Sequence, residues 1–323
     1  MEETQLKTMR RDYGIQGWAL LAYVGIMNAA VMLPVGLMSI YLTFTALIEG
    51  NEPNVETMTA QILDASGWGY LLAIVIGAVV LLLWKKPQFC FGTVWKRGKT
   101  MTVGSFFAIL SLFMSAQLIS QLGITGVEAL LNLFDLSMDA YLESVSVSTD
   151  GLSMFLYVGL GAPISEEILF RGLVLRSMES HGKRFAIVAS ALLFGLFHGN
   201  LIQAPFAFLV GLVLGYVTVE YNIGWAMALH MFNNLIIADT MTRLLSDLPA
   251  SVSDMIFWVL MALFTAAAVV ALVIKRDQVV EYFKREKIDP LCAKAFFTAP
   301  GIIVLLIVLL LTVAFSFAAV FML

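Results

Sequence analysis

Charged residues are scarce in this sequence. Only 13% of the 323 residues are Asp, Glu, Lys or Arg, 60% are hydrophobic, and the mean hydropathy is +0.90. Because soluble globular domains carry about 25% charged residues, this composition excludes a soluble protein of ordinary kind. Apolar runs of about 20 residues, each long enough to cross a bilayer as a helix, recur along the chain. The sequence predicts an all-α, polytopic transmembrane helix bundle.

Cysteine is almost absent as well. Cys90 and Cys292 are the two cysteines. Both are expected in cytoplasmic loops, where thiols stay reduced, and neither has a Cys or His nearby at metal-binding spacing. We therefore assign them no function. The chain also lacks a repeat of fixed period, a low-complexity tract and a Pro- or Ser-rich linker, which predicts one membrane domain.

About eight to nine spans are expected from the apolar runs. The first run is far longer than a signal-peptide core of about 7 to 15 residues, so it is predicted to be a retained span, with Pro34 as the point where it would bend. The predicted spans are 17–45, 68–84, 103–122, 151–170, 184–200, 202–220, 224–245, 254–274 and 299–323.

Lys and Arg lie almost entirely on one side of these spans. All except Arg243 fall on the side that holds the N-terminus, and such a bias marks the cytoplasmic face. We expect a multi-pass plasma-membrane protein with a cytoplasmic N-terminus and an extracytoplasmic C-terminus. The expected partners are membrane lipid, with anionic lipid favoured in the inner leaflet, and a membrane-associated peptide or protein substrate. Nothing indicates nucleic acid, and a monomer is the expected state.

Two stretches between the spans have helical periodicity. From Val127 to Val147 apolar residues recur at helical spacing, which predicts an amphipathic helix on the outer surface. It could be a lid, a substrate contact or an ordinary loop helix packed on the bundle. Val279 to Lys287 is a short basic element of the inner face, for which a solvated surface is a sufficient explanation.

Three charged residues interrupt the apolar pattern at the inner end of the span 151–170. A charge at bilayer depth costs about 2.5 to 3.5 kcal/mol, so Glu166, Glu167 and Arg171 together indicate a function. In a helix Glu167 and Arg171 share a face, whereas Glu166 points about 100° away. Glu167 is predicted to form a supporting ion pair with Arg171, and Glu166 to act as general base and then acid. The alternative is a single ion network at a helix end.

The next polar motif is Phe194-Gly195-Leu196-Phe197-His198. A lone His in an apolar helix often does no more than hydrogen-bond a neighbouring helix. Here Gly195 and Gly199 flank the position and would let another helix approach closely, as a catalytic pair between helices requires.

The third motif is His230-Met231-Phe232-Asn233-Asn234. His230 and Asn234 are one helical turn apart and share a face, so both can donate hydrogen bonds to one oxygen atom, as an oxyanion hole requires. Asn233 is interpreted as a packing or helix-pairing residue. Intramembrane ionisable groups usually face the interior of a bundle, so the three motifs are expected to converge into a hydrolase constellation.

Depth raises one conflict with this expectation. Along ideal straight helices with the spans given above, Glu166 lies nearer the inner face and His198 nearer the outer. Either the span limits or the assumption of straight helices is therefore wrong, and a kink at Pro163 is one way to close the gap.

The order Glu-Glu-x-x-x-Arg, Phe-x-x-x-His, His-x-x-x-Asn on successive helices resembles the CPBP (Abi) family of intramembrane proteases. The best-known members of that family are the type II CAAX prenyl endopeptidases. The resemblance runs from about Gly151 to about Leu248. It divides the chain into N-terminal helices with the amphipathic segment (1–150), the catalytic core helices (151–248) and C-terminal helices (249–323).

The resemblance implies hydrolysis of peptide bonds within the membrane. Glu166 and His198 match the family's pair that activates water, and His230 and Asn234 match its oxyanion stabilisers. The supporting ion pair matches the remaining residues of the first motif. Substrates of the family include prenylated CAAX proteins, and other members are linked to bacteriocin immunity and peptide maturation.

Members of this family are often called metalloproteases. If a metal is required, Glu166, His198 and His230 are the expected zinc ligands, with water in the fourth place. A Glu–His pair also activates water directly, and the carboxamide of Asn234 is a poor zinc ligand. We therefore expect a metal-independent glutamate mechanism and assign no cofactor, with Zn as the alternative.

Two other classes of function are compatible with the sequence. A catalytically inactive scaffold or bacteriocin-immunity protein of the same fold predicts that Glu166→Ala leaves the cellular phenotype intact. A transporter that uses the charged residues as a solute or proton pathway predicts an inverted repeat of hydropathy, which the sequence does not have.

Overall fold

The computed structural model describes residues 2–50, 55–146 and 149–318. Within these ranges the chain is helical almost throughout and forms no strand. Among the described residues, the helices that are long and apolar enough to cross a membrane number seven, namely Glu2–Glu49, Ala60–Trp84, Val103–Asn132, Leu152–His181, Gln203–Glu220, Ala250–Ile274 and Pro300–Ala318. The prediction of an all-α, polytopic helix bundle is confirmed.

The α-helices are α1 (Glu2–Glu49), α2 (Val55–Trp84), α3 (Val103–Asn132), α4 (Asp139–Val145), α5 (Leu152–Leu156), α6 (Ala162–Glu166), α7 (Arg176–Met178), α8 (Lys183–Phe197), α9 (Gln203–Glu220), α10 (Ile223–Phe232), α11 (Thr242–Ser246), α12 (Ala250–Ile274), α13 (Arg276–Arg285), α14 (Pro290–Phe297) and α15 (Pro300–Ala318). The wider π-helices are η1 (Phe89–Thr93), η2 (Tyr157–Gly161), η3 (Glu167–Leu175) and η5 (Asn233–Met241), and η4 (Glu179–His181) is a 3-10 turn. α1 continues as one helix through Pro34, so the bend expected there does not interrupt it.

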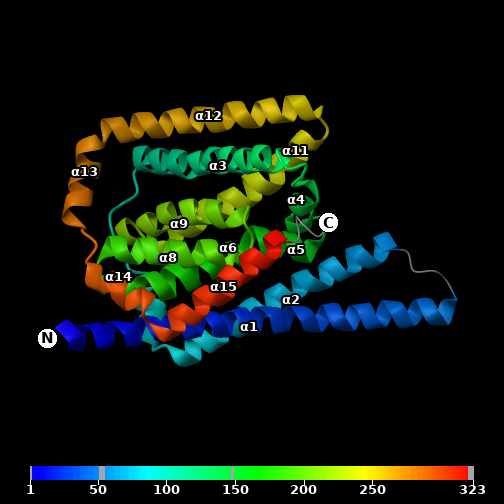
Figure 1. Ribbon diagram of the computed structural model, residues 1–323, viewed down its shortest axis with the longest axis horizontal. Helices are drawn as coiled ribbons and strands as arrows, with labels where there is room; N and C mark the ends of the chain where they lie inside the picture. The colour runs from blue at the N-terminus through cyan, green and yellow to red at the C-terminus, as the bar shows by residue number, and fades with distance from the viewer. Residues whose placement is uncertain (1, 51–54, 147–148, 319–323) are drawn as a thin grey trace.

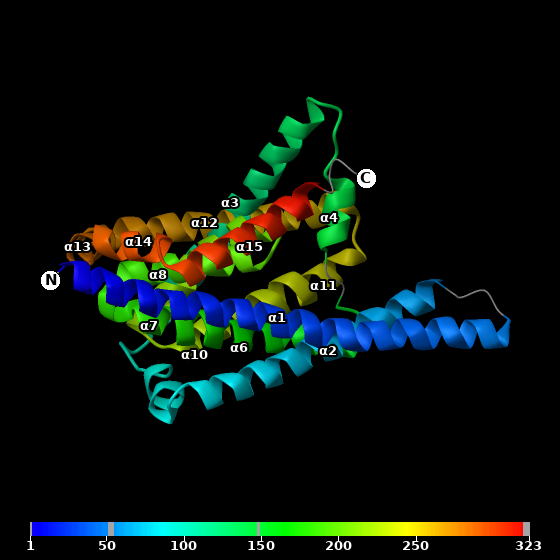
Figure 2. The same ribbon diagram turned by 60° about the horizontal axis from the view of Figure 1, so that its bottom comes forward.

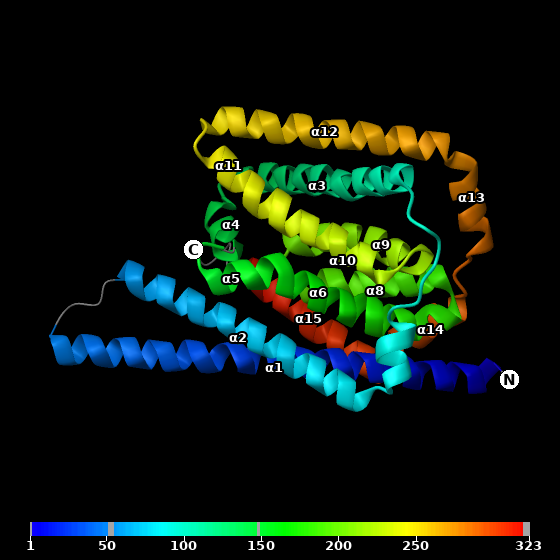
Figure 3. The same ribbon diagram turned by 180° about the vertical axis from the view of Figure 1, so that it is seen from behind.

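The long helices run roughly along one direction (Figure 1). α8 and α9 pack against each other in the middle, α3 and α12 lie side by side on one side, and α1 pairs with α2 on the other. α15 crosses obliquely between α8 and α1, as Figure 2 also shows. Seen from behind, in Figure 3, the far ends of α1 and α2 project beyond the rest of the bundle. The helices that carry the three motifs lie between the α3–α12 pair and the α1–α2 pair.

The basic connections gather at the end of the bundle where α1 begins. The Arg176 guanidinium, 5% exposed, donates to the Lys96 and Thr218 carbonyls. Glu220 accepts from both Lys99 and Lys183, at 2.7 and 3.1 Å. These contacts join the loop after η1 to the end of α9 and the start of α8. One end of the molecule therefore carries the positive charge that the topology prediction assigned to the inner face.

Residues 127–147 form two helices rather than the single amphipathic helix predicted. α3 continues to Asn132, the chain then turns through Asp135 at a φ of 56°, and α4 follows. Val147 lies outside the described residues. The prediction was wrong because the apolar period continues through the turn, where Leu131, Met138 and Tyr141 form a small buried cluster. The basic inner-face element predicted at 279–287 corresponds to α13.

The helix that carries the two glutamates is longer than the predicted span 151–170. It remains helical from Leu152 to His181, and Gly182, at a φ of 127°, turns the chain into α8. Glu166 and His198 each lie sixteen residues from Gly182, and His198 is close enough to Glu166 to interact with it electrostatically. The conflict in depth arose because Arg171 resembles a charge at a helix end, whereas its side chain is fully buried.

Candidate active site

Each of the helices that carry the first and third motifs changes from α- to π-geometry at the motif. η3 begins at Glu167, directly after Glu166 ends α6, and η5 begins at Asn233. A further π-helical turn, η2, precedes α6. Wide turns of this kind occur mostly as single bulges and frequently at functional sites. They also shift the register of the residues that follow, so the 3.6-residue period does not set which side chains share a face.

Glu167 and Arg171 form a buried ion pair. Arg171 Nη1 donates to Glu167 Oε1 at 3.0 Å, and both side chains are 0% exposed. Arg171 also donates to the Gly211 carbonyl of α9, at 3.3 Å. Buried charges of this kind are tolerated when each has a partner, so the pair and its carbonyl contact allow two charges to lie inside the apolar bundle.

Glu167 also holds the imidazole of His230. His230 Nδ1 lies 3.0 Å from the same oxygen, Oε1, that accepts from Arg171. A carboxylate oxygen accepts, so Nδ1 is the protonated ring nitrogen, and Nε2 points away from Glu167. Nε2 lies 3.8 Å from Glu166 Oε2. The first and third motifs therefore meet across α6, η3 and α10, with His230 between the two carboxylates.

Glu166 differs from its neighbour in its surroundings. Its side chain is 15% exposed, against 0% for Glu167. Within the described residues, its one ion-pair contact is the long one to His230. Tyr157 in η2 is close enough to interact electrostatically with it. Glu166 therefore has free carboxylate oxygens, whereas one Glu167 oxygen is shared by two donors.

His198 reaches the same region from the end of α8. Its Nδ1 lies 2.9 Å from the Phe194 carbonyl, and a carbonyl only accepts, so Nδ1 carries the hydrogen and Nε2 the lone pair. The Phe194 ring lies edge-on to both imidazoles, with ring centroids 4.9 Å from His198 and 5.8 Å from His230. The Arg171 guanidinium lies over the face of that ring, at 4.1 Å. Phe194 is thus the apolar centre around which the three motifs gather.

Gly195 provides the close helix contact that the second motif predicted. A Cβ at this position would lie 2.8 Å from the Ala204 carbonyl oxygen of α9, which is closer than real Cβ atoms approach. α8 and α9 therefore pack at short range beside His198.

Asn234 belongs to a chain of amides that links three elements. Its Nδ2 donates to the Val158 carbonyl of η2 at 2.8 Å, and its Oδ1 accepts from Asn233. Asn233 in turn accepts from Gln117 of α3 at 2.9 Å. A primary amide has two N–H groups, so Asn234 keeps one for another acceptor. Asn233 connects helices, as its interpretation as a packing residue predicts.

Sequence reasoning missed Gln117 and the aromatic pair Tyr70 and Tyr157. The two tyrosine rings stack with centroids 4.4 Å apart, and so join α2 to the motif helix. Gln117 had a recognisable signal, because an amide within an apolar span needs a partner. The tyrosines had none, since aromatic residues are common in the spans.

The donors in the site do not form a metal-binding group in this conformation. Within the described residues, no three or more His, Cys, Asp or Glu side chains are arranged to hold a metal ion. His230 Nδ1 is bound to Glu167, and the same Glu167 oxygen is bound to the Arg171 guanidinium. This leaves Nε2 as the ring nitrogen of His230 that faces Glu166.

The fold and the site together define a class of protein, a polytopic helical membrane protein with a site of ionisable residues inside its bundle. Ionisable residues inside an apolar bundle are expensive and usually mark a functional site, and here two carboxylates, a guanidinium and two imidazoles meet in one.

A comparison with known protein families gives a match to part of the chain. Residues 148–236 match the model of the family described as type II CAAX prenyl endopeptidase Rce1-like, so the resemblance inferred from the motifs is confirmed for this part of the chain. At the level of the family, the match supports a CAAX-type intramembrane protease. No curated protein and no solved structure matches the chain.

Proposed function

We propose that this protein is an intramembrane endopeptidase that hydrolyses peptide bonds of membrane-associated or lipidated peptides and proteins. The observation that supports this most is the division between the two adjacent glutamates. Glu167 is bound to Arg171 and His230, while Glu166 keeps free carboxylate oxygens beside the same imidazole. An ion network that served only the helix end would have no reason to leave one carboxylate free.

In the proposed reaction Glu166 takes a proton from a water molecule. The Nε2 lone pair of His198 accepts the other hydrogen of that water as a hydrogen bond and orients it. The water oxygen attacks the carbonyl carbon of the scissile bond and gives a tetrahedral intermediate. Glu166 then passes its proton to the leaving nitrogen as the C–N bond breaks. The products are a free carboxylate and a free amine.

His230 and Asn234 are the proposed donors to the developing oxyanion. Glu167 holds Nδ1 of His230, so Nε2 is the ring nitrogen that points away from Glu167. An Nε2–H can stabilise the oxyanion together with the second N–H of Asn234. Glu167 acts through His230 as a positioning residue.

The decisive test is cleavage of a membrane-peptide library by purified protein in nanodiscs, with CAAX and bacteriocin-leader peptides included. We expect Glu166→Gln to reduce the rate by about 100-fold or more, the usual contribution of a general base. Glu281→Gln makes the same change on the exposed face of α13 and should leave the rate unchanged. Activity that survives a chelator supports a metal-independent reaction, whereas loss with rescue by zinc contradicts it.

Two results would reject the proposal. Cleavage by Glu166→Gln at the wild-type rate removes Glu166 from the reaction. No cleavage above the background of that variant, with the known peptide classes present, favours an inactive scaffold or immunity protein of the same fold.

We also propose that the basic end of the bundle faces the cytoplasm of a plasma membrane, with the chain as a monomer. The clustering of Lys96, Lys99, Arg176 and Lys183 at that end supports this orientation. A membrane-impermeant lysine reagent applied to intact cells should label none of the three lysines (Lys96, Lys99 and Lys183) and should label them after permeabilisation. Labelling in intact cells contradicts the orientation.

A further inference from the structure

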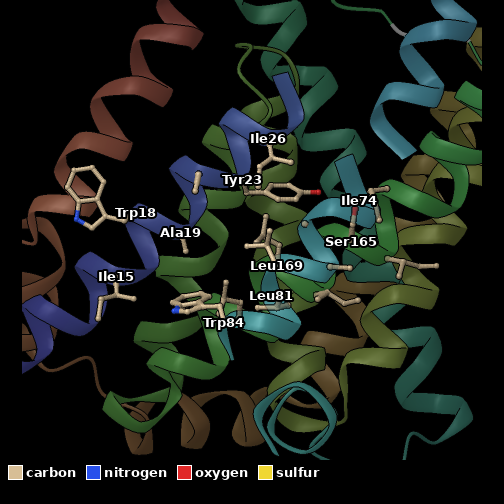
Figure 4. A pocket seen from close by; sticks show the side chains of 17 residues that line it. Ile15, Trp18, Ala19, Tyr23, Ile26, Ile74, Leu81, Trp84, Ser165 and Leu169 are labelled. Carbon is tan, nitrogen blue, oxygen red and sulfur yellow. The ribbon is translucent and has the colours of Figure 1, made fainter. Parts of the chain in front are cut away.

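A largely apolar cavity of about 430 Å³ lies outside the residues of the proposed reaction. Its walls are the first half of α1, the second half of α2, and the segment α6 to η3. Figure 4 shows the lining side chains, with Trp84 and Ile15 near one end and Tyr23, Ile74 and Ser165 near the other. Trp18 and Trp84 are 51% and 43% exposed, so the cavity opens to the outside of the bundle. Its volume lies within the range of about 300 to 1,000 Å³ typical of ligand sites.

One end of this cavity carries a cation. Lys85 directly follows Trp84, and its Nζ lies 4.1 Å from the centroid of the Trp84 ring and 5.0 Å from that of Phe89. Burial lowers the pKa of Lys85 from its ordinary value. Within the described residues no carboxylate forms an ion pair with it, although other lysines at the same end have Glu partners.

The other end is close to the proposed reaction site. Tyr23 and Ser165 both line the cavity and interact with each other, and Ser165 directly precedes Glu166. A hydrocarbon chain that entered beside Trp84 would therefore run along α1 and α2 towards the polar group Tyr23–Ser165. The cavity thus combines a half-buried cation at the membrane surface with an apolar channel that leads inward.

We infer that this cavity binds an anionic phospholipid of the surrounding membrane, with its headgroup phosphate at Lys85 and one acyl chain between α1, α2 and η3. The argument is charge complementarity. The Lys85 ammonium is half-buried against two aromatic rings without an ion-pair partner among the described residues, so an anionic group beside it would stabilise it. A zwitterionic headgroup has no net negative charge and would stabilise it less. Lys85 lies at the basic end of the bundle and directly after a membrane span, which is the level at which lipid headgroup phosphates are expected. The site is separate from the proposed hydrolysis, and its test reads binding alone.

The experiment is native mass spectrometry of the full chain in detergent, titrated with phosphatidylglycerol or phosphatidylcholine of the same acyl chains. We expect phosphatidylglycerol to be retained more tightly. Lys85→Gln should weaken phosphatidylglycerol about fivefold, the effect of one lysine near a membrane surface, and should leave phosphatidylcholine unchanged. Lys86→Gln is the matched control, because it removes the neighbouring charge from an exposed side chain.

A second variant tests the acyl chain independently of charge. Ala19→Phe fills the cavity from α1 and should reduce retention of both lipids, whereas Ala29→Phe, on an exposed position of the same helix, should not. Melting temperatures identify variants that fail to fold, and Ala78→Leu from α2 replaces Ala19→Phe in that case.

Three outcomes overturn the inference. If Lys85→Gln and Lys86→Gln weaken phosphatidylglycerol binding equally, the lipid responds to the total positive charge at the basic end of the bundle and not to this site. Unchanged retention in both cavity variants places the acyl chain elsewhere. Binding of a lipidated peptide with no phospholipid retained assigns the cavity to substrate.

Discussion

At the scale of single residues, the site depends on the different environments of two identical side chains, Glu166 and Glu167. Glu166 and Glu167 are adjacent in sequence, yet one is partly exposed with free oxygens and the other is buried between a guanidinium and an imidazole. The sequence predicted the ion pair of Glu167 with Arg171 from their i, i+4 spacing, and the role of Glu166 as general base stays a prediction. It did not predict the bond from Glu167 to His230, because contacts between distant segments depend on the packing of helices rather than on local spacing.

The ion pair leads to a prediction about stability. Arg171→Met leaves Glu167 charged and buried with one partner fewer, which should cost about 3 to 5 kcal/mol and lower both folded yield and melting temperature in detergent. His230→Gln leaves the Glu167–Arg171 pair in place and should fold normally with low peptidase activity. Size-exclusion profiles and thermal unfolding measure the first effect, and peptide cleavage the second. Equal yields with full activity in both variants would be inconsistent with this arrangement.

At the scale of elements, hydropathy predicted most helices well and failed at the motif helix. The apolar runs of α9, α12 and α15 stand almost where the sequence placed them, because charged residues occur only near the ends of these helices. α3 extends ten residues beyond its predicted end at residue 122. The motif helix was ended eleven residues too early, since Arg171 and Arg176 resemble cytoplasmic charges. Both are buried and bonded to carbonyls or carboxylates. The π-helices were also unpredictable, because no residue pattern in the sequence marks them.

The turn between the motif helix and α8 is a second point where a prediction can be tested. Gly182 has a φ of 127°, which side chains rarely adopt, so Gly182→Ala should destabilise the fold by about 1 to 3 kcal/mol. Gly104→Ala is the control, because Gly104 lies within α3 with open space around it and alanine favours a helix. Thermal unfolding in one detergent compares them. A melting temperature for Gly182→Ala at or above that of Gly104→Ala contradicts the prediction.

At the scale of the whole molecule, the first and last long helices touch. A Cβ on Gly17 of α1 would overlap the backbone of Gly301 in α15, so the two helices cross at glycine-to-glycine distance, as small residues allow in membranes. The same α1 supplies a wall of the cavity. The sequence did not predict this contact, because the residues of an apolar span do not specify which other span it packs against.

Overpacking at the crossing should therefore weaken the bundle. Gly17→Val forces the two backbones apart and is expected to cost about 1 to 3 kcal/mol. Gly25→Val is the matched control on the same helix, where a Cβ meets nothing within 4 Å. Thermal unfolding measures both variants. A stability for Gly17→Val equal to that of Gly25→Val would show that α1 and α15 do not pack this way.

The glycine crossing also bears on the order in which the molecule is made. α1 is synthesised before the motif helices and α15 after them, so α1 has to wait for the helix that it crosses at Gly17. Until then α1 has α2 beside it but lacks the helix that packs against its first half. The cavity beside Ser165 therefore has its α1 wall held in place only after the motif helices have been made.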